Sequence, residues 1–127
     1  MTSPAGTRIL VVDDTDIARM LCVRVLREAG YTVIEARNGL EALERLAGPR
    51  PDLLITDSTM PGMDGAALIA EVRRRHPRLP ILRTSGSFGL SGSRSYLPSD
   101  IRTLDKPFET DQLLDAVASL LAEAEEA

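Results

Sequence analysis

The sequence predicts an α/β protein with a doubly wound sheet of five parallel strands. Short apolar runs alternate along the chain with longer stretches in which apolar residues recur every three or four positions, and these spacings are typical of strands and helices respectively. The connections between the two kinds of segment are short. Because parallel strands need crossover connections, this alternation favours a parallel sheet with helices on both faces. At 127 residues the chain has the length of a single domain.

The composition of the five expected strands predicts where each lies in the sheet. Continuous apolar runs are typical of strands covered on both faces, whereas alternating polarity is typical of edge strands. The runs at Ile9–Val12, Leu53–Ile55 and Ile81–Leu82 are continuous, and those at Thr32–Ala36 and Ile101–Asp105 alternate. With the second and fifth strands at the edges, the order is 2-1-3-4-5. In this flavodoxin-like order, ligands bind outside the carboxyl ends of strands one and three.

Four helices are expected from apolar periodicity, at Asp16–Ala29, Gly39–Ala47, Gly65–His76 and Thr110–Ala124. Asn38 stands where a helix N-cap belongs, and Gly30 stands where a helix ends. The stretch from Gly86 to Ser99, where a further helix should follow the fourth strand, is rich in glycine and serine. Since these residues are poor helix formers, we expect a weak, short or absent helix there.

Cys22 is the only cysteine of the chain, so no intramolecular disulfide is possible. It recurs with Ala18, Leu21 and Val25 on one face of the first expected helix. This spacing predicts a buried structural thiol rather than a reactive one.

Composition and charge exclude several functional classes. Hydrophobic residues make up 43% of the chain and charged residues 27%, as in ordinary soluble domains. No apolar run approaches the roughly 18 residues that span a membrane, and no signal-peptide segment is evident, so we expect a cytoplasmic protein. The net charge of −4 argues against direct DNA binding, and Arg73–Arg75 is expected to be a solvated helix end. We expect a flexible N-terminus over residues 1–7, a folded domain over 8–122 and an acidic tail over 123–127.

Reactive side chains follow four of the five expected strands. Because the carboxyl ends of parallel strands meet at one edge, we expect these side chains to lie together there. They are Asp13, Asp14, Asp57, Thr84, Ser85 and Lys106. Three carboxylates, a hydroxyl from Thr84 or Ser85 and an ammonium are groups suited to phosphoryl transfer.

The three carboxylates predict a divalent cation. At about 5 Å and an effective dielectric constant of about 20, each pair repels by roughly 3 kcal/mol, and one lysine cannot offset three negative charges. Oxygen ligands of this kind suit Mg²⁺ or Mn²⁺, and no cluster of His or Cys offers a softer site. The alternative is that these acids merely cap helices.

Asp57 is the candidate nucleophile. It follows a buried strand and precedes a turn-rich segment, which we expect to project its carboxylate into solvent. A carboxylate can attack phosphorus to give an aspartyl phosphate if nearby cations neutralise the transferring oxygens. Ser85 can donate to one phosphoryl oxygen and Lys106 can pair with another. Lys106 is the single lysine among 15 Lys and Arg residues, which supports a specific role as a compact charge at a phosphate.

From Ile9 to about Leu121 the chain resembles the receiver domains of bacterial two-component response regulators. The resemblance rests on Val11–Asp14, Ala36–Leu43, Asp57 with Met60–Gly65, Ser85–Gly86 and Lys106–Phe108. It implies that Asp57 is the phosphoacceptor, that the donor is a phosphohistidine on a sensor histidine kinase or phosphotransfer protein, and that the domain catalyses only its own phosphorylation and dephosphorylation.

The resemblance also implies individual roles for the site residues. Asp14, Asp57 and the backbone carbonyl of Thr59 would ligate Mg²⁺, with Asp13 acting through water. Ser85 rather than Thr84 matches the switch hydroxyl, and a cis bond is implied between Lys106 and Pro107. Thr84, Ser58 and Pro107 are secondary candidates.

Two positions depart from the family pattern and concern signal output. Thr103 stands where an aromatic residue is common, and Arg83 stands where an apolar residue is usual. The segment Leu97–Asp100 resembles receivers attached to hybrid histidine kinases. We expect output through protein contact, either by phosphate relay or by docking at the last strand and its flanking helices. We expect the protein to be a monomer or a weak dimer.

Three other functions fit parts of the pattern. A haloacid-dehalogenase-like phosphatase needs a second Asp two positions after the nucleophile, where this chain has Thr59. A flavodoxin-like electron carrier needs a loop that accepts a phosphate, and Asp13–Asp16 would repel one. A degenerate receiver would keep the shape and bind partners without phosphorylation. His76 is the sole histidine and is expected to have a structural role at a helix end, so the phosphoryl donor must come from elsewhere.

Overall fold

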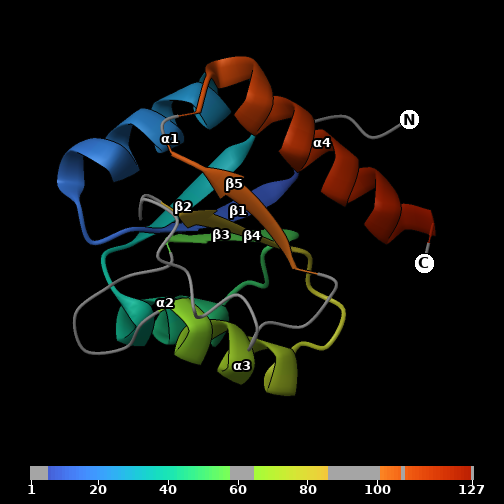
Figure 1. The fold of residues 1–127 in the computed structure, drawn as a ribbon. Coiled ribbons are helices and arrows are strands. Elements are labelled where there is room, and N and C mark those ends of the chain that lie inside the picture. The colour runs from blue at the N-terminus through green and yellow to red at the C-terminus, as the bar shows by residue number, and fades with distance from the viewer. Residues whose placement is uncertain (1–5, 58–64, 86–100, 107, 127) are drawn as a thin grey trace.

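The five strands form one parallel sheet in the order β2-β1-β3-β4-β5, as the sequence predicts. In this computed structural model, the described residues are 6–57, 65–85, 101–106 and 108–126. The strands are β1 (Arg8–Val12), β2 (Thr32–Ala36), β3 (Leu53–Asp57), β4 (Ile81–Ser85) and β5 (Arg102–Asp105). The predicted doubly wound α/β fold is confirmed (Figure 1).

The described residues form four helices, and the first and last residue of each lie within two positions of the predicted ones. They are α1 (Asp16–Glu28), α2 (Gly39–Leu46), α3 (Gly65–Arg75) and α4 (Thr110–Glu126). The helix α4 continues to Glu126, through most of the segment expected to be an acidic tail. The stretch from Gly86 to Ser99 lies outside the described residues, so its expected weak helix stays a prediction. None of the helices in the described part of the chain is both long and apolar enough to cross a membrane.

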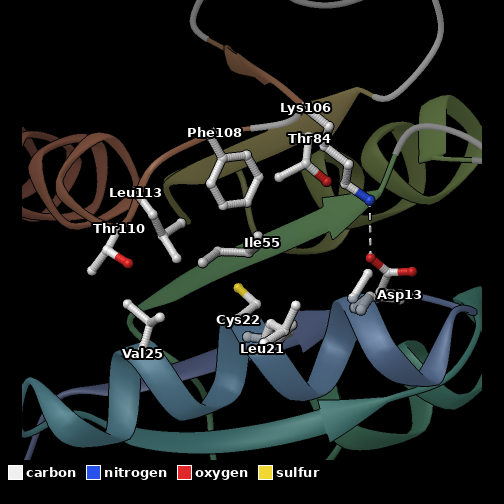
Figure 2. Close-up of a pocket in the computed structure, with 13 residues that line it drawn as sticks. Asp13, Leu21, Cys22, Val25, Ile55, Thr84, Lys106, Phe108, Thr110 and Leu113 are labelled. Atoms are coloured by element: carbon white, nitrogen blue, oxygen red, sulfur yellow. Dashed lines mark hydrogen bonds and ion pairs between the residues drawn. The ribbon is translucent and has the colours of Figure 1, made fainter.

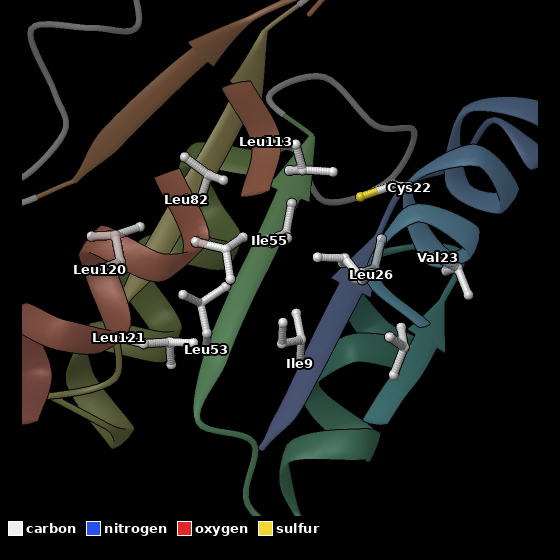
Figure 3. Close-up of a cluster of buried hydrophobic side chains, with 13 residues drawn as sticks. Ile9, Cys22, Val23, Leu26, Leu53, Ile55, Leu82, Leu113, Leu120 and Leu121 are labelled. Atoms are coloured by element: carbon white, nitrogen blue, oxygen red, sulfur yellow. The ribbon is translucent and has the colours of Figure 1, made fainter. Parts of the chain in front are cut away.

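The helices cover the two faces of the sheet in pairs. Figure 1 shows α1 and α4 on one face and α2 and α3 on the other. Successive strand residues point to opposite faces, so each continuous apolar strand contributes to two core clusters. The first core cluster includes Ile9, Leu26, Leu53, Ile55, Leu82, Leu113 and Val117 (Figure 3). The second includes Leu10, Val12, Leu54, Leu68, Ile69, Val72 and Ile81.

Asn38 and Gly30 mark where α2 begins and where α1 ends, as the sequence indicates. Asn38 has an extended backbone and its side chain accepts a hydrogen bond from the backbone N–H of Glu41 at 2.8 Å, so it caps α2. Gly30 follows α1 with φ of 103°, a left-handed conformation that glycine adopts without strain.

At the end of α3, Arg73 donates to the carbonyl of Leu79, while Arg74 and Arg75 pair with Glu71. The basic run is therefore a helix end with internal partners.

The face of α1 predicted to be buried is only partly so. Cys22 is buried as predicted, but Leu21 is 59% exposed. Arg19 is buried instead, with 8% of its surface exposed. A charged residue takes this position because the fold supplies partners for its guanidinium from outside α1.

Candidate functional site

The three predicted carboxylates meet at the carboxyl edge of the sheet. Asp13 directly follows β1, and Asp57 is the last residue of the neighbouring strand β3. The carboxylates of Asp13, Asp14 and Asp57 each have an oxygen within 4.8 Å of the others. Parallel pairing in register produces this juxtaposition, since Val12 pairs with Thr56 one residue before each acid.

Lys106 follows the edge strand β5 and reaches the carboxylates from there. Its Nζ lies 3.2 Å from Oδ2 of Asp13 and 3.4 Å from Oδ1 of Asp57. Burial lowers the pKa of Lys106, but the nearby carboxylates of Asp57 and Asp13 raise it more, so the net pKa is raised. The lysine is therefore protonated at neutral pH, and one positive charge faces three carboxylates. This excess of negative charge on oxygen donors fits a hard divalent cation.

The three carboxylates differ in exposure. Asp13 is held from two sides, because its Oδ1 accepts from the backbone N–H of Thr15 at 2.9 Å and its Oδ2 contacts Lys106. Asp14 is exposed. The Asp57 side chain is only 12% exposed, so the expectation that it projects into solvent is wrong. The reason is that Asp57 belongs to the strand itself, where Asp13 and Lys106 flank it.

The candidate hydroxyls fall on β4. Thr84 pairs in register with Asp57 and is buried. Ser85 is the last residue of β4 and pairs with Asp105, but its side chain is not among the described parts of the structure. Ser58, Thr59 and Pro107 also lie outside the described residues. The choice of Ser85 over Thr84 therefore stays a prediction.

An apolar pocket of about 500 Å³ opens between α1 and the start of α4. Asp13, Thr84 and Lys106 line one end, while Cys22 and Phe108 line its apolar part (Figure 2). The pocket was not predicted, because its existence depends on how far apart two distant helices sit. Burial raises the pKa of the Cys22 thiol to about 12, which supports the predicted structural role.

Arg19 is the residue near this site that the sequence reasoning missed. Its Nη1 donates to the backbone carbonyl of Asp13 at 2.9 Å. The spacing of three residues between Asp16 and Arg19 was the one available signal, because it allows an ion pair along a helix.

Comparison with known proteins decides the family. The family model described as "Response regulator receiver domain" matches residues 9–118. The chain belongs to this family. The receiver domain is 37% identical over 119 residues to the DNA-binding transcriptional regulator NtrC of Escherichia coli, covering 93% of this chain and 25% of NtrC. It is 40% identical over 117 residues to the sensor kinase CckA of Brucella abortus, covering 89% of this chain and 12% of CckA.

Solved receiver structures have the same fold. A response regulator receiver protein from Sinorhizobium medicae superimposes with a TM-score of 0.86 at 31% identity, covering 96% of this chain and 99% of that one. The chain spans a quarter or less of the length of the two curated relatives named above. It is thus a receiver domain of two-component signalling, a regulatory module rather than a conventional enzyme. Receiver domains bind Mg²⁺ at an acidic pocket, and the Asp13, Asp14 and Asp57 cluster is consistent with such a site.

Proposed function

We propose that Asp57 accepts a phosphoryl group from a phosphohistidine on a sensor histidine kinase or a histidine phosphotransfer protein. A carboxylate oxygen of Asp57 forms a bond to phosphorus as the phosphorus–nitrogen bond of the phosphohistidine breaks. The imidazole leaves, and the product is an aspartyl phosphate. The single observation that carries this proposal is the position of Asp57 at a strand end, 3.4 Å from Lys106 and clustered with two further carboxylates.

The contacts of Asp13 indicate a positioning role for this residue. Both carboxylate oxygens of Asp13 are used within the protein, one by the Thr15 N–H and one by Lys106. Two fixed donors hold this carboxylate in one orientation. Asp13 therefore suits the role of holding neighbouring groups in place.

The residues fit Mg²⁺ or Mn²⁺. Asp14, Asp57 and the backbone carbonyl of Thr59 would hold the ion, with Asp13 acting through water. When bound, the ion would neutralise negative charge on the transferring oxygens. The charge balance supports this assignment, since one ammonium faces three carboxylates within 4.8 Å of one another.

Lys106 would pair with a phosphoryl oxygen after transfer. Its flexible stem and compact charge allow its Nζ, now 3.4 Å from Asp57, to follow the oxygen that gains the phosphoryl group. The hydroxyl of Ser85, or that of Thr84, would donate to another oxygen. A change in these contacts would shift the conformational equilibrium that partners read.

Exposed apolar side chains at the same edge support a protein donor. Ile17 is 73% exposed, Met20 63% and Leu40 65%. Ile17 and Leu40 lie in the first turns of α1 and α2, which begin at the carboxyl edge of the sheet. A partner that brings a phosphohistidine to Asp57 must cover this edge, and these side chains offer it an apolar contact.

Intact-mass measurement after incubation with acetyl phosphate and Mg²⁺ tests the proposal. We expect one phosphate adduct on the native protein and none on Asp57→Asn. An equal adduct on the variant would reject Asp57 as the acceptor. No adduct on the native protein would favour the degenerate receiver, which binds partners without phosphorylation.

A further inference from the structure

Arg19 is a buried cation that links three separate parts of the fold. Its Nη1 donates to the backbone carbonyl of Asp13 at 2.9 Å, and this contact is buried. Its Nη2 contacts Asp16 in the first turn of α1 at 2.6 Å. Its Nε contacts Glu35 on the edge strand β2 at 3.2 Å. A flat guanidinium with several donors in fixed directions can satisfy all three at once, whereas a lysine cannot.

The cost of burying this charge is offset by its two carboxylate partners. A buried charge without partners is strongly unfavourable. Burial lowers the pKa of Arg19, but the hydrogen bonds and charges of Asp16 and Glu35 raise it more, so the group stays ionised. Both partners are themselves partly exposed, Asp16 at 75% and Glu35 at 38% of the side chain. Neither is therefore forced to lose its solvation to hold the arginine.

The Asp13 carbonyl that accepts from Arg19 belongs to the loop that carries two of the three acids. The backbone N–H of Asp13 donates to the carbonyl of Ala36 at 3.1 Å, which ties the start of the loop to the β2 end. The Thr15 N–H donates to the Asp13 side chain, and the Arg19 N–H donates to the Thr15 carbonyl at 2.9 Å. The guanidinium of Arg19 adds the bond to the Asp13 carbonyl. Asp14 therefore sits between two residues whose backbones are both held.

From these contacts we propose that Arg19 is a positioning residue for the metal site, holding the loop of Asp13 and Asp14 so that their carboxylates face Asp57. This inference rests on the proposed function. Arg19 acts from behind the site, through the Asp13 carbonyl, and contributes no ligand itself. Glu35 and Asp16 fix the guanidinium in turn, so the edge strand β2 is part of the support of the site.

The charge of Arg19 and its positioning role would have opposite effects on metal affinity. Removing a cation near a divalent metal site strengthens metal binding through simple electrostatics. Removing a support of the ligand loop weakens it, and loss of such an outer contact costs about 10- to 100-fold in metal affinity. A role confined to the stability of α1 predicts a third result, a lower melting temperature with the metal affinity of the folded protein unchanged.

The test measures binding of Mn²⁺ alone, by the electron paramagnetic resonance signal of the free ion, at a temperature where circular dichroism shows each variant folded. We expect Arg19→Met to weaken Mn²⁺ binding about 10- to 100-fold and Arg19→Lys to restore part of the loss. Arg24→Met is the matched control, because Arg24 lies on the same helix, is 77% exposed and forms an exposed ion pair with Glu28. It should change the affinity by less than about twofold, since exposed charges are screened.

A folded Arg19→Met protein with native or tighter affinity overturns the inference. If Arg19→Met does not fold, Glu35→Gln decides, because it loosens the guanidinium from the β2 side while the arginine remains. We expect that variant to weaken Mn²⁺ binding severalfold, and an unchanged affinity in it would then overturn the inference. A native protein that binds no Mn²⁺ rejects the proposed function and this inference together, whereas native binding with an insensitive Arg19 rejects this inference alone.

Discussion

The ammonium of Lys106 lies 3.4 Å from the carboxylate of Asp57, although the two residues are 49 positions apart in the chain. The strand order brings them together, since β3, β4 and β5 are neighbours whose carboxyl ends share an edge. Asp57 ends β3, and Lys106 follows β5 directly. The site is therefore assembled by the sheet, and the ammonium of Lys106 compensates part of the negative charge of the carboxylates.

Replacing Lys106 by methionine should destabilise the metal-free protein. The change leaves the partly buried Asp13 and Asp57 carboxylates without their cation, and we expect a loss of about 1–2 kcal/mol in the free energy of unfolding. Urea unfolding in the presence of a chelator measures it. Arg102→Met is the control, because Arg102 pairs with Glu123 in an exposed ion pair of the kind that contributes less than about 1 kcal/mol. Equal losses in the two variants would contradict the prediction.

The contribution of Lys106 should depend on pH in a defined direction. Burial lowers the pKa of Lys106, and the carboxylates of Asp57 and Asp13 raise it more. Since the folded pKa exceeds the unfolded value of about 10.4, the stabilisation is complete below that pH and is lost as the pH rises through the folded pKa. The stability difference between native and Lys106→Met should stay constant from neutral pH to about pH 10 and shrink above it. A difference that grows with rising pH would show that the pKa is lowered instead.

Asp14→Asn should separate repulsion from metal binding. Without metal, the variant loses one of three clustered carboxylates and should be equally or slightly more stable, by less than about 1 kcal/mol because Asp14 is exposed. At a Mg²⁺ concentration of about ten times its dissociation constant, the native protein should gain about 1.4 kcal/mol. The variant should lose most of that gain. Thermal unfolding with Mg²⁺ or chelator measures both effects, and a native protein insensitive to Mg²⁺ would refute the expected cation site.

The sheet and most of the acidic site could be predicted because their signals are local. Continuous and alternating runs distinguish central from edge strands, and the residue after each run is then placed at the shared edge. Asp13, Asp57 and Lys106 are thereby predicted to lie together without any knowledge of distances. The order 2-1-3-4-5 makes β1 and β3 neighbours and so brings Asp13 next to Asp57.

Arg19 and the pocket could not be predicted in the same way. Helical periodicity assigns apolar residues to the core and charged residues to solvent, but Arg19 is buried and Leu21 is 59% exposed. Its burial depends on the Asp13 carbonyl and on Glu35 of another element, and no pattern within α1 indicates either. The pocket depends likewise on the separation of α1 from α4.

Paired alanine substitutions should confirm which face of α1 contacts the sheet. Leu26 is fully buried in the first core cluster, so Leu26→Ala should cost about 2–5 kcal/mol in the free energy of unfolding. Leu21→Ala, on the exposed side of the same helix, should stay within about 0.5 kcal/mol. Urea unfolding of both variants gives the comparison. A larger loss for Leu21→Ala would mean that α1 is rotated relative to the described packing.

Cys22 should be chemically inert in the folded protein although it lines an open pocket. Alkylation requires the thiolate, and burial raises the pKa of Cys22 from 9.0 to about 12. At pH 8 the thiolate fraction is then about 10³-fold lower than in the unfolded chain. Alkylation by iodoacetamide, followed by mass spectrometry, should be slower by about that factor in the native protein than in concentrated urea. A native rate within about tenfold of the unfolded one would mean that the thiol ionises freely and that Cys22 is a reactive group of this pocket.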